Sequence, residues 1–197
     1  AFCSSSVTSL VDDIFIYLVN NASNLFSVQH IVNFFKSKNR KVSYDTLSNY
    51  LGYIEEAFLA YKTERYNIKG KDVVAGNCKY YLNDLSFKNF LYPGFAYGVG
   101  YLLENAVYLE LRRLGYIVYT GSFRDKEVDF VAMKDDRVIY LQATYMLETA
   151  QTMEREYAPL LTIGDNYEKY VVSMDEVQFP SNEGVRHIQA WNLKEIL

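Results

Sequence analysis

Residues 115–145, which read GYIVYTGSFRDKEVDFVAMKDDRVIYLQATY, hold the pattern that decides the fold. Two polar stretches interrupt segments that are rich in β-branched and aromatic residues, and this alternation is typical of strands joined by short turns. The pattern predicts three consecutive strands, at 116–120, 127–133 and 137–145.

Outward from this segment, the spacing of apolar residues changes to that of helices. Residues 98–114 form a long apolar stretch that ends at Gly115, a residue suited to the end of a helix. A second helix is predicted at 149–161, where Pro159 should kink or end it. Further strands at 169–174 and 185–191 and a short closing helix at 193–197 complete a mixed α/β domain, which we expect over residues 86–197.

The N-terminal part predicts three helices and a hairpin. One helix covers 7–19, the second follows Ser27 and the third begins near Ser43, because serine is a favoured N-cap. The predicted inward face of the third helix comprises Leu47, Tyr50, Leu51, Ile54 and Phe58. Strands at 61–68 and 79–82 then complete a winged helix-turn-helix over residues 1–85, with 84–97 as a connector. A small helical domain without a role in DNA binding is the alternative.

Composition narrows the class of protein. Half of the 197 residues are hydrophobic, which fits a folded chain of one large or two small domains. The net charge of −4 argues against bulk nucleic-acid binding, but it is unevenly distributed. Residues 1–95 carry 10 basic and 8 acidic side chains, whereas residues 96–197 carry 10 and 16. This asymmetry suggests two modules with different partners.

The sequence shows no membrane or secretion signal. No apolar run reaches the ~20 residues of a membrane helix, and no basic start precedes an apolar block. Cys3 and Cys78 are too few for a disulfide framework or a zinc site. We therefore expect a cytoplasmic protein without membrane contact. Because the chain begins with Ala1, it is interpreted as a processed chain or a fragment.

Two acids stand where apolar residues are expected. Glu104 lies among apolar neighbours in the predicted helix at 98–114, and Asp129 lies in the middle of a predicted strand. A buried carboxylate is costly unless a cation or a hydrogen-bond donor meets it. Strict alternation would place Asp129 on the face of Val131 and Met133. The plain alternatives are a local pair of Glu104 with Arg112 or Arg113, and a water-facing Asp129.

The third strand adds Gln142 and Thr144 on one face. A helix with an acid, a strand with an aspartate and a polar pair on the next strand resemble the PD-(D/E)XK nuclease superfamily. This resemblance implies a Mg²⁺ site formed by Glu104, Asp129 and Gln142, with Thr144 at the position of the family's catalytic lysine. Gln142 and Thr144 stand where the family has an acid and a lysine. The resemblance therefore implies a nuclease-like domain with weak or no activity. Lys169 or Arg155 could approach from another element.

A longer set of motifs resembles the C-terminal half of a family of bacterial and archaeal predicted ATP-binding proteins of the AAA type. These motifs include Tyr50-Leu51-Gly52-Tyr53-Ile54, Lys79-Tyr80-Tyr81-Leu82, Leu103-Glu104-Asn105-Ala106-Val107, Glu127-Val128-Asp129-Phe130-Val131 and Tyr140-Leu141-Gln142-Ala143-Thr144. In that family an ATPase module precedes a winged helix and a domain of unknown function, and Gln is usual at position 142.

The chain itself lacks a nucleotide-binding motif. No Gly-x-x-x-x-Gly-Lys-Ser/Thr occurs, so ATP would bind only through an N-terminal module that is missing from this chain. His30 and His187 are isolated in the sequence, and we expect neither to belong to a nucleophile or metal cluster.

The basic run at 36–41 is the best signal for nucleic acid. In a winged helix it would flank the recognition helix and contact phosphates of double-stranded DNA. The expected contact residues are Lys36, Lys38, Arg40 and Lys41 on phosphates, Thr46 and Asn49 at base edges, and Lys69 and Lys71 on the wing. A solvated turn without a ligand is the alternative.

Two functions follow from these patterns. The first is a binding and regulatory fragment of an AAA-type ATPase, which docks DNA or a protein partner and performs no chemistry. The second is a Mg²⁺-dependent nuclease that uses Glu104, Asp129 and Gln142.

Overall fold

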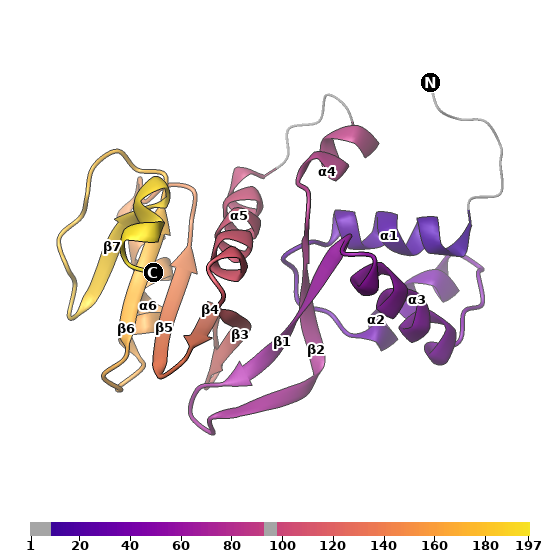
Figure 1. Ribbon diagram of the computed structural model, residues 1–197, viewed down its shortest axis with the longest axis horizontal. Helices are drawn as coiled ribbons and strands as arrows, with labels where there is room; N and C mark the ends of the chain where they lie inside the picture. The colour runs from indigo at the N-terminus through magenta and orange to yellow at the C-terminus, as the bar shows by residue number, and fades with distance from the viewer. Residues whose placement is uncertain (1–8, 93–97) are drawn as a thin grey trace.

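The computed structural model describes residues 9–92 and 98–197 and shows a mixed α/β fold, which confirms the predicted class. Figure 1 shows a group of helices at the N-terminal end, a long hairpin, and a sheet flanked by two helices. The helices are α1 (Leu10–Asn20), α2 (Val28–Ser37), α3 (Tyr44–Glu56), α4 (Ser86–Leu91), α5 (Val99–Arg113), α6 (Ala150–Leu161) and the 3₁₀ segment η1 (Ala190–Glu195). The strands are β1 (Ala60–Asn67), β2 (Asp72–Leu82), β3 (Ile117–Phe123), β4 (Lys126–Lys134), β5 (Arg137–Ala143), β6 (Glu168–Ser173) and β7 (Val185–Gln189).

The helix starts follow the capping residues of the sequence. Ser27 and Ser43 cap α2 and α3 by accepting a hydrogen bond from a backbone N–H of the first turn, as predicted. Ser9 caps α1 in the same way and forms a capping box with Asp12. The predicted start of this first helix at residue 7 lies outside the described residues. Past α5, Gly115 adopts φ +88°, which few other residues tolerate.

The seven strands found among the described residues belong to one sheet, in the order β2-β1-β3-β4-β5-β6-β7. The three predicted consecutive strands, β3, β4 and β5, pair antiparallel, and β6 and β7 extend the sheet from β5 with parallel pairing. Helix α5 packs on one face of this sheet and α6 on the other, so that two apolar clusters lie on opposite sides (Figure 1).

The hairpin joins the two parts of the molecule. Residues 65–67 of β1 pair in parallel with residues 120–122 of β3. The half of the predicted wing next to the hairpin turn is therefore hydrogen-bonded to the central strands of the sheet. The other half packs against the helices: Cys78, Tyr80 and Leu82 of β2 lie in the same apolar cluster as α1, α2 and α3. Strand β2 therefore contributes side chains to the apolar cores of both parts.

The helical core extends beyond the expected boundary at residue 85. Helix α4 lies inside the segment that the sequence assigned to a connector, and its Phe87 and Leu91 pack against the core of the helices. The Phe87 ring makes an edge-to-face contact with Phe15 of α1. We call α1 to α4, together with the part of the hairpin that contains Cys78, Tyr80 and Leu82, the helical module.

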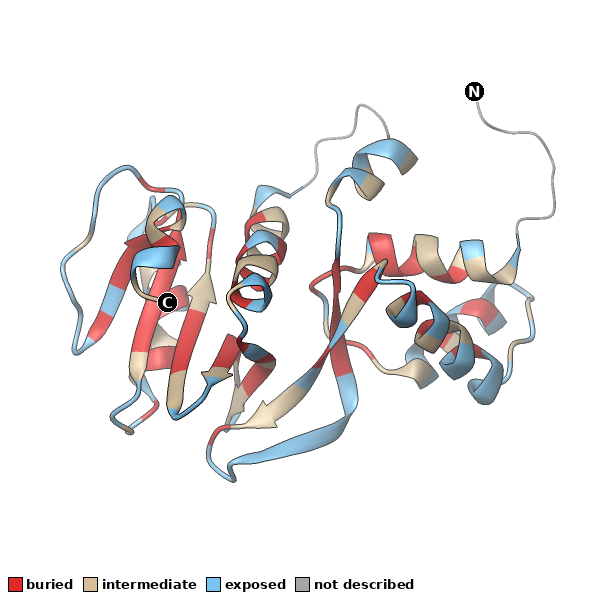
Figure 2. Cartoon of the chain, viewed as in Figure 1, coloured by how far each residue is buried: buried red, intermediate tan, exposed pale blue. Residues whose placement is uncertain are grey.

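One predicted core residue is wrong. The spacing predicts Phe58 on the buried face of α3, but the helix ends at Glu56 and Phe58 is 64% exposed with φ +56°. Its neighbours Leu47, Leu51 and Ile54 are buried as predicted, while Tyr50 is half-buried. The early end of the helix rotates Phe58 away from the core. Figure 2 shows that β2 is exposed from the hairpin turn to its middle and buried beyond it.

Within the described residues, no helix has both the length and the apolar character needed to cross a membrane.

Candidate functional site

Four charged side chains meet beneath α5, and we call them the Lys79 cluster: Lys79 of β2, Glu104 of α5, and Glu127 and Asp129 of β4. The Lys79 Nζ atom lies 2.9 Å from Glu104 Oε1, 2.7 Å from Glu127 Oε1 and 3.8 Å from Asp129 Oδ1. The Lys79 side chain is only 4% exposed. The two acids that the sequence singled out therefore do come together, around a lysine that the sequence analysis did not select.

Alternation along β2 places the lysine. Because neighbouring side chains of a strand point to opposite faces, Tyr80 enters the helical core whereas Lys79 and Tyr81 face α5. The Tyr81 hydroxyl donates a 2.8 Å hydrogen bond to Glu104 Oε1. Glu104 thus pairs with β2, and the local pair with Arg112 or Arg113 does not form; Arg113 instead binds Glu110.

Asn105, the residue after Glu104, fixes α5 against the same strand. Its side chain is fully buried and bonds both backbone groups of Leu82: the Leu82 N–H donates to Oδ1 at 2.8 Å, and Nδ2 donates to the Leu82 carbonyl at 2.9 Å. A single amide side chain thereby continues the hydrogen bonding of β2, which holds Glu104 in register with Lys79.

The face of Asp129 differs from the prediction. The pairing of β3 with β4 shifts between Tyr119, which lies opposite Val131, and Gly121, which lies opposite Val128. One extra residue of β4 is accommodated there, which breaks strict alternation. Val131 packs in the apolar cluster under α6, whereas Asp129 reaches Lys79 on the α5 side.

Gln142 and Thr144 do not join the charged group. Gln142 Oε1 accepts a 3.3 Å hydrogen bond from the backbone N–H of Asp129, and the N–H of Ala143 donates to Asp129 Oδ2 at 2.9 Å. Thr144 is buried and bonds through its backbone N–H to the Val172 carbonyl. Gln142 therefore supports the backbone beside Asp129 and does not point its oxygen at the two carboxylates.

The charges of the cluster shift one another's ionisation. Burial alone would lower the pKa of Lys79, but the nearby charges of Glu104, Asp129 and Glu127 outweigh it, so the pKa of Lys79 is raised. Burial and then the charge of Glu104 raise the pKa of Asp129, against the opposing effect of Lys79. Lys79 is therefore firmly cationic, whereas Asp129 holds a proton more readily than an exposed aspartate.

The other basic candidates are engaged elsewhere. Lys169 Nζ donates to the Asp165 carboxylate and to the backbone carbonyls of Asp165 and Tyr167. Arg155 pairs with Glu156, whose buried carboxylate adds to the electrostatic effects that raise the pKa of Asp129. Glu156 of α6 is a further acid that the sequence analysis missed.

Magnesium, which the nuclease resemblance implied, does not fit this arrangement. Mg²⁺ requires oxygen ligands at about 2.0–2.1 Å in near-octahedral geometry. Here an ammonium lies between the carboxylates, Glu104 Oε1 also accepts from Tyr81, and the Gln142 oxygen is used by a backbone N–H. Among residues 9–92 and 98–197, no three His, Cys, Asp or Glu side chains are arranged to hold a metal ion.

The predicted DNA-contact residues divide into four groups. Lys36 in the last turn of α2, Lys41 between α2 and α3, and Asn49 in the middle of α3 are all exposed. Thr46 is exposed, but its hydroxyl is 2.8 Å from the Ser43 hydroxyl at the start of α3. Lys69 and Lys71 are exposed at the hairpin turn, which Figure 1 shows at the end of the hairpin away from α1–α3.

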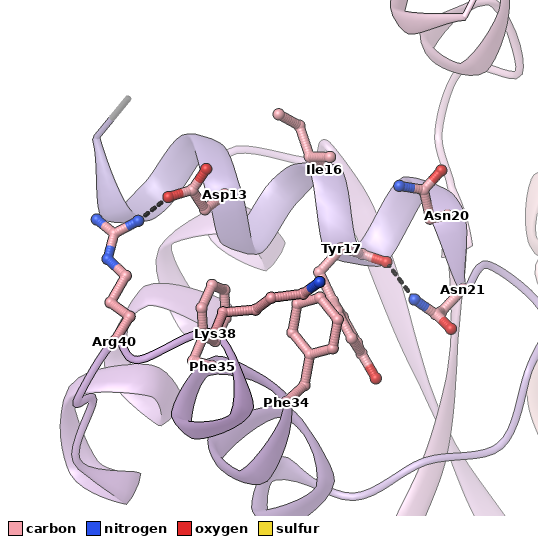
Figure 3. A pocket seen from close by; sticks show the side chains of 9 residues that line it. All are labelled: Asp13, Ile16, Tyr17, Asn20, Asn21, Phe34, Phe35, Lys38 and Arg40. Atoms are coloured by element: carbon pink, nitrogen blue, oxygen red, sulfur yellow. Dashed lines mark hydrogen bonds and ion pairs between the residues drawn. The ribbon is translucent and has the colours of Figure 1, made fainter. Parts of the chain in front are cut away.

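Lys38 and Arg40 line a groove of about 460 Å³ between α1 and α2. Figure 3 shows the Lys38 side chain extending toward Tyr17 and Phe34, with its Nζ 6.0 Å from the centre of the Phe34 ring. Arg40 forms an ion pair with Asp13 across the same groove. These two cations therefore face a groove of the module, which the sequence did not indicate.

His187 is isolated in the sequence but has polar neighbours in the fold. Phe179 N–H donates to His187 Nδ1 at 3.1 Å, which leaves the ring proton on Nε2, 2.8 Å from Ser173 Oγ. The Ser173 hydroxyl then donates to Asp175 Oδ2 at 2.7 Å. Since no ring nitrogen is free to take the serine proton, this buried Ser, His and Asp group has no activated nucleophile.

The chain is similar to two longer proteins. It is 33% identical over 166 residues to an uncharacterized protein of Haemophilus influenzae, covering 84% of this chain and 41% of that protein. It is 32% identical over 143 residues to an uncharacterized protein of Methanocaldococcus jannaschii, covering 71% of this chain and 31% of that protein. The chain thus spans less than half the length of these relatives. No family model and no solved structure matches it.

The sequence around Lys79 contains a pattern that indicates a buried ion pair. It is the one charged residue in the run Cys78-Lys79-Tyr80-Tyr81-Leu82, and a lysine inside a buried strand requires a carboxylate partner. Its partners lie 25 to 50 residues further along the chain, so their identity depends on which strands and helix become neighbours.

Proposed function

We propose that this chain is a binding and regulatory portion of a longer ATP-binding protein of the AAA type, and that it docks double-stranded DNA without cutting it. The observation that carries the absence of cutting is the position of Lys79. The ammonium lies 2.9 Å from Glu104 and 3.8 Å from Asp129, the two carboxylates that the nuclease resemblance assigns to the metal, and 2.7 Å from Glu127. The greater length of the relatives supports a role as one part of a larger protein.

The order of three helices and a hairpin supports a winged helix as the docking element. Lys36, in the last turn of α2, and Lys41, in the segment that leads to α3, are exposed, and we expect phosphates of a duplex to lie at this end of the module if α3 enters the major groove. The hairpin supports this less, because the half next to its turn is paired with β3. The proposed interface therefore centres on the turn between α2 and α3.

Duplex-DNA binding over a range of salt concentrations tests the docking. Lys36→Gln/Lys41→Gln removes two charges from the proposed interface, whereas the control Arg112→Gln/Lys194→Gln removes two from exposed positions on α5 and η1. In the first variant alone, we expect the slope of log affinity against log salt to become shallower by about one for each phosphate-bound lysine that is replaced. Equal changes in both variants, or no binding at low salt, would contradict the proposal and leave a protein partner as the ligand.

Plasmid nicking in Mg²⁺ or Mn²⁺ tests the absence of chemistry. We expect no cutting by the pure wild-type protein. Cutting that Asp129→Ala abolishes would instead establish the nuclease.

A further inference from the structure

We propose that Lys79 is the resident cation of the carboxylate cluster, and that the hairpin delivers it in place of a divalent metal. While the hairpin is in place, the site is filled and closed to metal ions. This inference stands independently of whether the helical module docks DNA.

The first support is the match between donor and acceptors. An ammonium has three donors and accepts no hydrogen bond, and here it faces three carboxylates, those of Glu104, Glu127 and Asp129. With 4% of its side chain exposed, Lys79 has little contact with water; Glu104 and Glu127 lie within hydrogen-bond distance of Nζ in place of water, and Asp129, at 3.8 Å, adds a charge-charge contact. Glu104 is 14% and Asp129 is 11% exposed, and the lysine neutralises charge that those two acids could not otherwise bury together.

The second support is competition for the same space. A divalent ion coordinated by these oxygens would lie within a few ångströms of Nζ, and two cations about 4 Å apart repel strongly in a partly buried site. Metal binding therefore requires the ammonium to leave. Lys79 cannot leave alone, because the adjoining Cys78 and Tyr80 are buried in the helical core.

The third support is the origin of each partner. Lys79 comes from the strand that packs against α1–α3, whereas Glu104 and the two β4 acids belong to the opposite part of the molecule. The ion pairs therefore hold the helical module on the sheet. In a protein with a metal here, that ion would connect only α5 and β4.

The decisive variant is Lys79→Met, which keeps the length of the side chain and removes its charge. The three carboxylates are then left together without a counter-ion, so we expect the thermal unfolding midpoint to fall by on the order of 10 °C. Millimolar Mn²⁺ or Mg²⁺ should restore a few degrees, because an ion that binds only the folded state stabilises it. The wild-type midpoint should not respond to either ion.

Lys62→Met is the matched control. Lys62 lies on the neighbouring strand β1, its side chain is 40% exposed, and it pairs only loosely with Glu64 at 3.5 Å. We expect this variant to unfold close to the wild-type temperature and to ignore divalent ions. A metal response in Lys79→Met that also appeared in Lys62→Met would overturn the proposal, as would no response in Lys79→Met.

Two measurements decide the matter if Lys79→Met does not fold. Lys79→Met/Glu104→Gln removes one of the opposed acids, and we expect it to fold because it relieves their repulsion; failure of the double variant to recover would count against the inference. Mn²⁺ titration of the wild-type protein, followed by electron paramagnetic resonance, should show no bound ion. Stoichiometric Mn²⁺ binding that Asp129→Asn removes would refute the proposal directly.

Discussion

His187 shows how hydrogen bonds around one side chain determine its charge. Both ring nitrogens are engaged, Nδ1 by the Phe179 N–H and Nε2 by Ser173, and the residue as a whole is 2% exposed. A second ring proton would have to bind Nδ1, where it would point at the Phe179 N–H and replace the hydrogen bond that Nδ1 accepts. Burial lowers the pKa of His187, although the charge of Asp175 works in the opposite direction. The folded chain therefore keeps His187 neutral at pH values where an exposed histidine would begin to charge.

We expect His187 to make the protein less stable as the pH falls below about 6.5. The pKa of His187 is lower in the folded chain than its usual value of 6.5, so the unfolded chain binds the proton more readily. This contribution to the free energy of unfolding is complete above pH 6.5 and is lost below it. Urea unfolding at a series of pH values measures it, and His187→Gln should flatten the dependence in this window.

His30 provides the control, because it is the second histidine of the chain and is exposed on α2. His30→Gln should keep the wild-type pH dependence. If His187→Gln and the wild type lost stability in parallel below pH 6.5, His187 would have no part in the effect.

At the scale of elements, two glycines have opposite surroundings. A Cβ atom on Gly121 of β3 would lie 2.8 Å from Val131 Cγ2 and 3.0 Å from both Ile68 Cδ1 and Val128 Cβ. Gly121 stands where the pairing of β3 with β4 shifts, so the close approach and the changed register occur together. Nothing lies within 4 Å of such an atom on Gly52, inside α3.

The same substitution should therefore change stability in opposite directions. Gly121→Ala forces β4 side chains to move and should lower the free energy of unfolding by about 1–3 kcal/mol. Gly52→Ala removes a flexible residue from a helix interior and should raise it by up to about 1 kcal/mol. Chemical denaturation of both variants measures the difference. A Gly121→Ala variant as stable as the wild type would show that the packing of β4 against Gly121 leaves room for a methyl group.

At the scale of the whole molecule, the shared strand β2 couples the two parts. Its side chains alternate between the core of the helices and the cluster under α5, and β1 pairs with both β2 and β3. Neither part can lose β2 without exposing its own core to water. We therefore expect the described chain to unfold as one cooperative unit.

Leu47→Ala tests this cooperativity. Leu47 is fully buried in the helical module, and its truncation should cost about 2–5 kcal/mol. The single tryptophan, Trp191, lies in η1, which follows β7 at the other end of the sheet. Trp191 fluorescence and far-UV circular dichroism should report the same lowered midpoint. A fluorescence midpoint that stayed at the wild-type value, with an earlier transition by circular dichroism, would show that the two parts unfold separately.

The sequence by itself determined the elements and their order. Several signals act over only a few residues and can be recognised without knowing the fold. They are the serine caps, the change from helical to alternating spacing, and the turns at 122–126 and 135–136. The same local information misplaced Phe58, since α3 ends two residues before it, and overlooked α4, a short helix that depends on contacts with the helical core.

Only the tertiary structure decided what surrounds the two predicted acids. The side of the sheet that Asp129 faces depends on a pairing shift between β3 and β4, which no alternation in β4 alone reveals. The cation between Glu104 and Asp129 comes from β2, because Asn105 and the hairpin bring β2 against α5. Local spacing sets which way a side chain points within its own element, but neighbours are set by how elements pack. Lys79 therefore became part of the site only when the hairpin joined the sheet.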